Sequence, residues 1–167
     1  MLTKTGFFNT LSLVLQKIED YILISLLLIM ITMAVLQIFL RNFFDSGIVW
    51  GDSLVRVLVL WIGLIGAMVA SRTDNHISID IISRFLPSHI KKFTTLTVHL
   101  FTAVVTAAMA WFSLVFVGME KADDIIAFGF MPAWVCEIII PIAFAVISVR
   151  YTLFSINQLI QLIPPRP

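Results

Sequence analysis

The sequence predicts an all-α membrane protein, a single membrane domain over residues 1–167 with four transmembrane helices and both termini in the cytoplasm. Hydrophobic residues make up 60% of the chain and charged residues only 13%, against about 25% charged residues in an average soluble domain. Four apolar stretches reach the length of about 20 residues that a helix needs to cross the hydrocarbon core. Lys and Arg are unevenly distributed among the connections, which indicates an orientation.

The composition excludes several classes of function. The formal net charge of +1 gives no basic excess for binding nucleic-acid phosphates. Cys136 is the only cysteine, so this chain has no pair for an internal disulfide, no dithiol redox pair and no cysteine cluster for a metal. We therefore expect no enzyme activity, no cofactor, no metal site and no nucleic-acid partner.

The N-terminal region predicts a surface helix followed by the first span. Apolar residues recur with helical spacing within residues 4–19, so this segment is expected to lie as an interfacial amphipathic helix on the cytoplasmic membrane surface. The first span covers residues 21–41, of which residues 21–40 carry no charge. A signal peptide is the competing interpretation. Charged residues up to Asp20 stand directly before an apolar run too long for a signal core, so we expect the span to be retained.

Three further spans are predicted. The second, residues 52–71, has a short charge-free centre and gains length from snorkelling arginines at its ends. The third covers residues 93–119 without a formal charge, and the fourth covers residues 132–156. Pro141 predicts a kink in the fourth span, because proline cannot complete the helical hydrogen bonding. The middle connection, residues 73–92, is predicted as a short cytoplasmic surface helix, although its alternating isoleucines also fit a strand.

The distribution of Lys and Arg predicts the orientation of the spans. Under the positive-inside rule, the side with more of these residues faces the cytoplasm. Eight of them belong to the N-terminal arm, the middle connection and the C-terminal end: Lys4, Lys17, Arg72, Arg84, Lys91, Lys92, Arg150 and Arg166. Three lie on the other side: Arg41, Arg56 and Lys121. Both termini and the middle connection are therefore expected in the cytoplasm.

A polar pair and two aromatic residues mark the start of the second span. Asp52 and Arg56 are four residues apart, so they share one helix face and can form a salt bridge. Trp50 and Trp61 are aromatic anchors of the type found at membrane boundaries. Two interpretations stay open for this group: a salt bridge at the outer boundary, or a polar patch that docks another subunit.

Small residues four positions apart indicate close helix packing. Gly63 and Ala67, and likewise Gly66 and Ala70, form two overlapping small-x-x-x-small pairs on the second span. The third span carries the same pattern from Ala103 onward. Such residues let helix backbones approach each other, either within the chain or against a partner.

The charged residues avoid the centres of the predicted spans. They lie near the ends: Asp52 and Glu137 at the outer side, Arg72 and Arg150 at the inner side. His99 lies deeper, but it has no second histidine at a matching depth for haem ligation, and an interhelical hydrogen bond is the preferred interpretation. Because carriers and proton-coupled exporters need polar groups deep in the membrane, the sequence favours a scaffold. The alternative is a stand-alone four-helix exporter that acts as a dimer.

Several of these residues follow one another in a distinctive order. Arg41 and Phe43 close the first span, and Trp50-Gly51-Asp52 opens the second. The pattern continues with Arg56, Trp61, the small residues from Gly63 to Ala70, Arg72, His76, Asp80 and Leu86-Pro87, and later with Met131-Pro132-Ala133-Trp134, Pro141 and Arg150. In this order and spacing the chain resembles the small membrane subunit, called the Q subunit or DctQ-like component, of tripartite ATP-independent periplasmic (TRAP) transporters. The resemblance covers most of the chain.

The resemblance implies a three-component complex in the bacterial inner membrane. The chain would be an accessory scaffold beside a large membrane subunit (M) that carries the substrate, and a periplasmic binding protein (P) would deliver that substrate. Uptake in the family is sodium-driven, and typical substrates are organic acids such as C4-dicarboxylates or sialic acid. The family often has two adjacent Glu residues after the first Trp, where this chain has Asp52 and Ser53. We expect contact with a partner at Trp50, Asp52, Arg56, Trp61, Gly63, Gly66, Ala67 and Ala70.

Overall fold

Long apolar helices dominate the structure, as the sequence predicts. The computed structural model describes the backbone of residues 3–72 and 88–162, and side chains within residues 13–72 and 93–160. Within this part of the chain, four helical segments are long and apolar enough to cross a membrane: Leu13–Phe44, Gly51–Ala70, Phe93–Ala122 and Ala133–Ile160. These segments confirm an all-α membrane protein. The surface helix predicted in the middle connection, together with His76, Asp80 and Pro87, lies outside the described residues.

The chain divides into two units. The first unit comprises Met1–Val69 and Val117–Ile139. The second comprises Ala70–Phe116 and Ile140–Pro167. The sequence prediction of a single membrane domain over the whole chain stays a prediction.

The first unit begins with α1 (Thr3–Phe44), an unbroken helix of 42 residues. At a rise of about 1.5 Å per residue it is about 63 Å long, roughly twice the hydrocarbon thickness of about 30 Å. The helix continues through Asp20, where the sequence places the boundary between a surface helix and the first span. The position of residues 4–19 along the membrane surface therefore stays a prediction.

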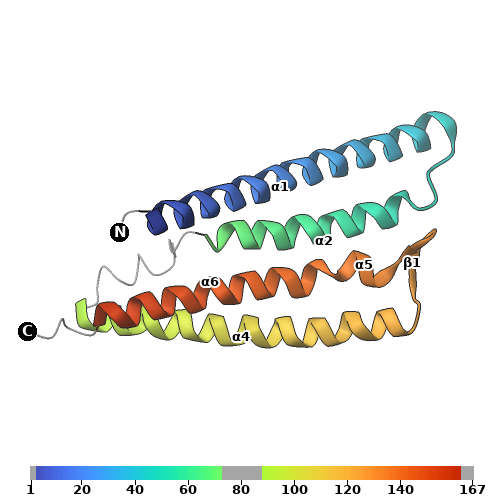
Figure 1. Ribbon diagram of the computed structural model, residues 1–167. Coiled ribbons are helices and arrows are strands. Elements are labelled where there is room, and N and C mark those ends of the chain that lie inside the picture. The colour runs from blue at the N-terminus through green and yellow to red at the C-terminus, as the bar shows by residue number, and fades with distance from the viewer. Residues whose placement is uncertain (1–2, 73–87, 163–167) are drawn as a thin grey trace, which may run out of the picture. The chain divides into compact units, whose positions relative to one another are not determined.

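A short turn joins α1 to α2 (Gly51–Ala70), which runs back in the opposite direction (Figure 1). Asp45 ends α1 in the left-handed region with φ 47°, a conformation that aspartate tolerates better than most residues. The N–H of Gly51 donates to the carbonyl of Ile48 at 2.9 Å, and that of Leu54 donates to the carbonyl of Trp50 at 3.0 Å. These bonds tighten the turn and start α2.

A small hairpin that the sequence did not predict follows the end of α4 (Ser88–Ala122). Strand β1 (Ile126–Phe128) pairs antiparallel with β2 (Met131–Pro132), and a short helix, α5 (Ala133–Glu137), comes directly after it. Gly129 occupies the turn with φ 57°, where glycine has no steric penalty. The hairpin belongs to the first unit, together with the last turns of α4.

The fourth span is interrupted where the sequence predicts a kink. Helix α5 ends at Glu137, Ile138 follows as a turn residue, and α6 (Ile139–Leu162) continues the span. Pro141 lies four residues after Glu137, so it cannot donate to that residue's carbonyl, and its ring crowds the same group. The interruption at Ile138 is the local effect expected of Pro141, and a bend of the span at this point stays a prediction.

In the second unit, α4 packs against α6. The hydroxyl of Ser148 donates to the carbonyl of Ala103 at 3.1 Å, and Ala103 itself is buried. His99 is 1% exposed, and its ring lies 5.9 Å from that of Tyr151 and 5.8 Å from that of Phe154. His99 thus lies within the contact between the two helices, and the interhelical hydrogen bond expected for it stays a prediction.

Candidate partner-binding face

One face of α2 carries most of the residues predicted to contact a partner. Asp52, Arg56, Gly63, Ala67 and Ala70 are all exposed. Their spacing of four, seven, four and three residues keeps them on one stripe of a helix with 3.6 residues per turn. Gly66 borders this stripe and is partly exposed. We call these six residues the small-residue face of α2.

The opposite face of α2 supplies the helix's contacts within the chain. Leu58, Ile65 and Met68 are 7%, 4% and 8% exposed, and their spacing places them on one side of the helix. These three large side chains face inward, whereas the outward face combines the small residues with Val59, which is 55% exposed.

Open space surrounds the two glycines of the small-residue face. A Cβ atom added at Gly63 or at Gly66 would meet no atom within 4 Å of the described chain. Their lack of a side chain is thus not required by packing within this part of the chain. On α4, by contrast, Ala103 is buried and receives the Ser148 hydroxyl. On α4, Ala103 thus packs internally while Ala107 is exposed, and contact of the α2 residues with a partner stays a prediction.

The two tryptophans predicted as contact residues have different environments. Trp50 is 46% exposed just before α2. Trp61 is partly buried, and its Nε1–H donates to the carbonyl of Cys136 at 2.8 Å. Cys136 lies in the last turn of α5, where helix carbonyls lack partners within their own helix. Trp61 therefore joins α2 to α5, whereas Trp50 remains accessible.

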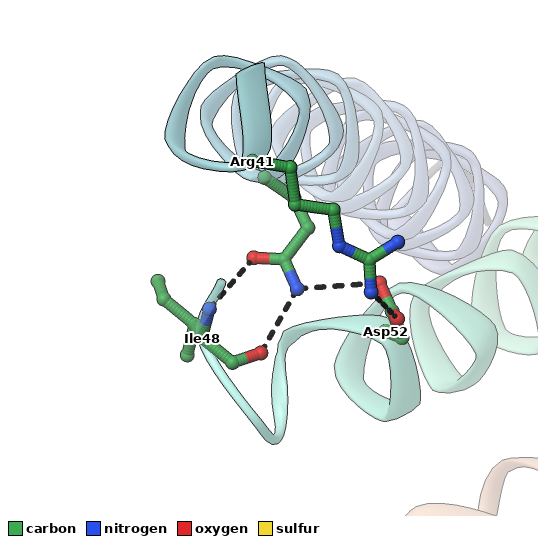
Figure 2. Close-up of polar contacts among 4 residues, drawn as sticks. Arg41, Ile48 and Asp52 are labelled. Atoms are coloured by element: carbon green, nitrogen blue, oxygen red, sulfur yellow. Dashed lines mark hydrogen bonds and ion pairs between the residues drawn. The ribbon is translucent and has the colours of Figure 1, made fainter. Parts of the chain in front are cut away.

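A glutamine that no sequence pattern singled out holds the turn between α1 and α2. Gln37 is 6% exposed. Its Nε2 donates to the carbonyl of Ile48 at 2.9 Å, and its Oε1 accepts from the N–H of Ile48 at 3.2 Å (Figure 2). The side-chain amide thus satisfies both backbone groups of one loop residue, as a neighbouring strand would.

Asp52 forms its ion pair with a residue of α1. An Nη2 hydrogen of Arg41 is donated to Oδ2 of Asp52 at 2.7 Å, and Nε2 of Gln37 donates to Oδ1 at 3.3 Å (Figure 2). Among the described residues, no ion pair joins Asp52 to Arg56, so the predicted pairing within α2 is corrected. The sequence feature that could have indicated these contacts is the spacing of Gln37 and Arg41, which are four residues apart and share one face at the end of the first span.

Gly51 leaves space for the glutamine amide. A Cβ at this position would lie 2.9 Å from both Nε2 and Oε1 of Gln37. Any larger residue would therefore displace the amide from its hydrogen bonds with Ile48. The glycine of the Trp50-Gly51-Asp52 sequence thus has a packing reason, which the sequence pattern alone did not supply.

Of the family motif formed by Arg72, His76, Asp80 and Pro87, only Arg72 lies within the described residues. Ser71, at the end of α2, is 4% exposed and accepts a hydrogen bond from Nη1 of Arg150 at 3.1 Å. Arg72 is partly exposed directly after it. The other motif residues predicted here, His76, Asp80 and Pro87, are not among those the structure describes.

Comparison with known proteins identifies a family. The family model described as the DctQ component of tripartite ATP-independent periplasmic transporters matches residues 29–163. The chain is 24% identical over 156 residues to the ectoine TRAP transporter small permease protein TeaB of Halomonas elongata, a match that covers 92% of this chain and 80% of TeaB.

A second relative is much longer than this chain. The sialic acid TRAP transporter permease protein SiaT of Haemophilus influenzae is 30% identical over 90 residues. This match covers 54% of the chain but only 15% of SiaT. The family match spans most of the chain, and four apolar helices lie within its described part. The chain therefore belongs to the DctQ component family of TRAP transporters and is a multi-pass protein of the inner membrane.

Proposed function

We propose that this chain is the accessory scaffold subunit of a sodium-coupled, binding-protein-dependent TRAP transporter for organic acids. In this proposal it assembles with the large membrane subunit, which carries the substrate, and a periplasmic binding protein delivers that substrate. The termini and the connection between α2 and α4 face the cytoplasm, as the eight-to-three distribution of Lys and Arg favours.

The observation that carries the proposal is the small-residue face of α2. Within a membrane, apolar residues gain little by leaving lipid for a protein surface, so helix association depends on close packing and on polar contacts. Gly63 and Gly66 allow a partner helix to approach the α2 backbone, because nothing in the described chain occupies the space beside them. This arrangement suits a permanent contact with a second membrane protein.

Arg56 adds a polar contact near the outer end of the same face. It is exposed, and among the described residues no ion pair is found for it, since Asp52 pairs with Arg41. An arginine at a lipid-facing position is costly unless it reaches the headgroups or meets an opposite charge. We propose that a carboxylate of the large subunit pairs with Arg56, which fixes the register of the contact.

The substrate class rests on the relatives. SiaT and TeaB are named as transporter proteins for sialic acid and for ectoine, both of which carry a carboxylate. An organic acid of the C4-dicarboxylate or sialic-acid type is therefore proposed for the complex. This chain's own contribution is to the static scaffold, which agrees with the location of its charged residues near the ends of the spans.

Co-purification tests the proposed contact. Tagged chain is co-expressed with the large subunit of the same transporter, extracted in mild detergent and captured, and the retained large subunit is quantified. Gly63→Leu is expected to reduce the retained amount about tenfold or more, which corresponds to about 1.4 kcal/mol of lost contact.

The matched control for this experiment is Gly118→Leu. Gly118 is an exposed glycine of α4, and a Cβ there also meets nothing within 4 Å. Both changes raise helix propensity and add the same side chain, so they differ only in the helix that carries them. Equal retention by the two variants would show that the small-residue face is not the contact.

A further inference from the structure

The hairpin between α4 and α5 is apolar throughout. The nine residues from 125 to 133 read Ile-Ile-Ala-Phe-Gly-Phe-Met-Pro-Ala and contain no charged side chain and no hydrogen-bonding side chain. Three of the large ones are accessible: Ile125 is 43% exposed, Ile126 is 62% exposed and Phe130 is 93% exposed. An exposed apolar segment of this kind indicates a contact with lipid or with another protein.

The backbone of this hairpin forms hydrogen bonds within the hairpin itself, which suits a location outside bulk water. Strands β1 and β2 pair with each other, with Ile126 opposite Pro132 and Phe128 opposite Met131. The N–H of Ala133 donates to the carbonyl of Ile125 at 2.8 Å. Non-helical backbone is costly near lipid because its polar groups lose water, and these internal bonds reduce that cost.

The residues next to the hairpin are of the types enriched at a membrane–water boundary. Lys121, in the last turn of α4, holds its Nζ 5.2 Å from the centre of the Trp134 ring at the start of α5. Tryptophan is enriched at the headgroup level, and lysine near a helix end extends toward it. Asp123 and Asp124 are exposed between α4 and β1 and mark the aqueous side.

Lipid is a better match for this surface than another protein. Protein interfaces outside the membrane combine an apolar centre with a polar rim and form about one hydrogen bond per 100–200 Å². Residues 125–133 offer no side chain for such bonds. The hairpin also follows directly in the chain after one helix long and apolar enough to cross a membrane, Phe93–Ala122, and precedes another, Ala133–Ile160.

We propose that residues 125–132 form a lipid anchor, in which the Phe130 tip of the hairpin inserts among the headgroups and the first acyl carbons. The anchor would hold the ends of α4 and α5 at a fixed depth. Such insertion buries apolar side chains by about 5–10 Å, as an interfacial amphipathic helix does.

Spin labelling of the full chain in phospholipid nanodiscs tests the anchor. A label is attached at Phe130→Cys in a Cys136→Ala background, and its collisions with oxygen, which concentrates in lipid, are compared with those of a water-soluble nickel chelate. We expect oxygen to dominate at position 130 and the nickel chelate to dominate at the control position, Asp123→Cys. Nickel dominance at position 130 would overturn the proposal, and so would protection from both reagents, which indicates coverage by protein.

A second labelling experiment leaves Phe130 at the tip of the hairpin unchanged. Ile126→Cys, labelled with Phe130 intact, is expected to be oxygen-accessible at a shallower depth than position 130. Adding Phe130→Asp should shift this label toward the nickel chelate, because a carboxylate at the tip opposes insertion, whereas Phe130→Leu should leave it unchanged. Equal behaviour of the Asp and Leu variants would contradict a tip that inserts in lipid.

Discussion

Gln37 and Gly51 fit together at the turn between α1 and α2, because a Cβ at position 51 would lie 2.9 Å from both polar atoms of the glutamine amide. Gly51→Ala therefore displaces that amide from Ile48. The expected loss is about 1–3 kcal/mol in the free energy of unfolding in detergent, the cost of leaving buried polar groups unsatisfied. Gly47→Ala is the control, because a Cβ there approaches Arg41 no closer than 3.4 Å.

The same contact predicts strong coupling between the two positions. Once Gln37→Ala has removed the amide, Gly51→Ala has nothing to displace and should cost almost nothing, or stabilise α2 through its higher helix propensity. Unfolding of both single variants and the double variant measures this coupling. If the two single effects simply add, then the close contact does not explain the glycine.

Gln37→Leu tests the hydrogen bonds at the turn directly. The leucine keeps apolar volume but leaves the N–H and C=O of Ile48 without their partner. We expect a loss of about 1–3 kcal/mol in the free energy of unfolding. Gln158→Leu, at a partly exposed position of α6, is the control and should change stability by less than about 0.5 kcal/mol. Similar losses in both variants would disprove the role of Gln37.

The ion partner of Asp52 can be measured by double-mutant cycles. The side chains of Arg41 and Asp52 are 63% and 48% exposed, so their coupling should be modest, about 0.2–1 kcal/mol. The cycle Arg41→Gln with Asp52→Asn is expected to show this coupling, and the cycle Arg56→Gln with Asp52→Asn none. A coupling energy larger for Arg56 and Asp52 than for Arg41 and Asp52 would show that Asp52 pairs with Arg56 within α2 instead.

Trp61 provides a test of the connection between α2 and α5. Trp61→Phe retains an aromatic ring but removes the N–H that bonds to the Cys136 carbonyl. A loss of about 0.5–1.5 kcal/mol in unfolding free energy is expected for this hydrogen bond. Trp111→Phe, on an exposed part of α4, makes the same chemical change and should be nearly neutral. Loss of stability only at position 111 would contradict this assignment.

Much of the architecture could be predicted because membrane spans depend on length and composition alone. The four apolar helices and the interruption near Pro141 follow directly from these properties. The predicted salt bridge failed because i, i+4 spacing considers only one helix, whereas Asp52 reaches Arg41 across a turn. The role of Gln37 depends on the conformation of Ile48 in that turn, which no periodicity encodes.

The hairpin was missed for a different reason. Its strands contain three and two residues, and their apolar side chains continue the composition of the neighbouring spans. Alternation cannot be recognised over so short a segment. The one local signal in the sequence was Gly129, because a glycine between two phenylalanines permits the positive φ of a tight turn.

Transport by reconstituted vesicles tests the scaffold role most directly. Vesicles are prepared with this chain alone, or with this chain and the large subunit, and both receive the periplasmic binding protein, a labelled organic acid and an inward sodium gradient. We predict accumulation in vesicles that contain both membrane subunits and none in vesicles that contain this chain alone. Accumulation of the acid by this chain alone would contradict the account, because a scaffold without its carrier moves no substrate.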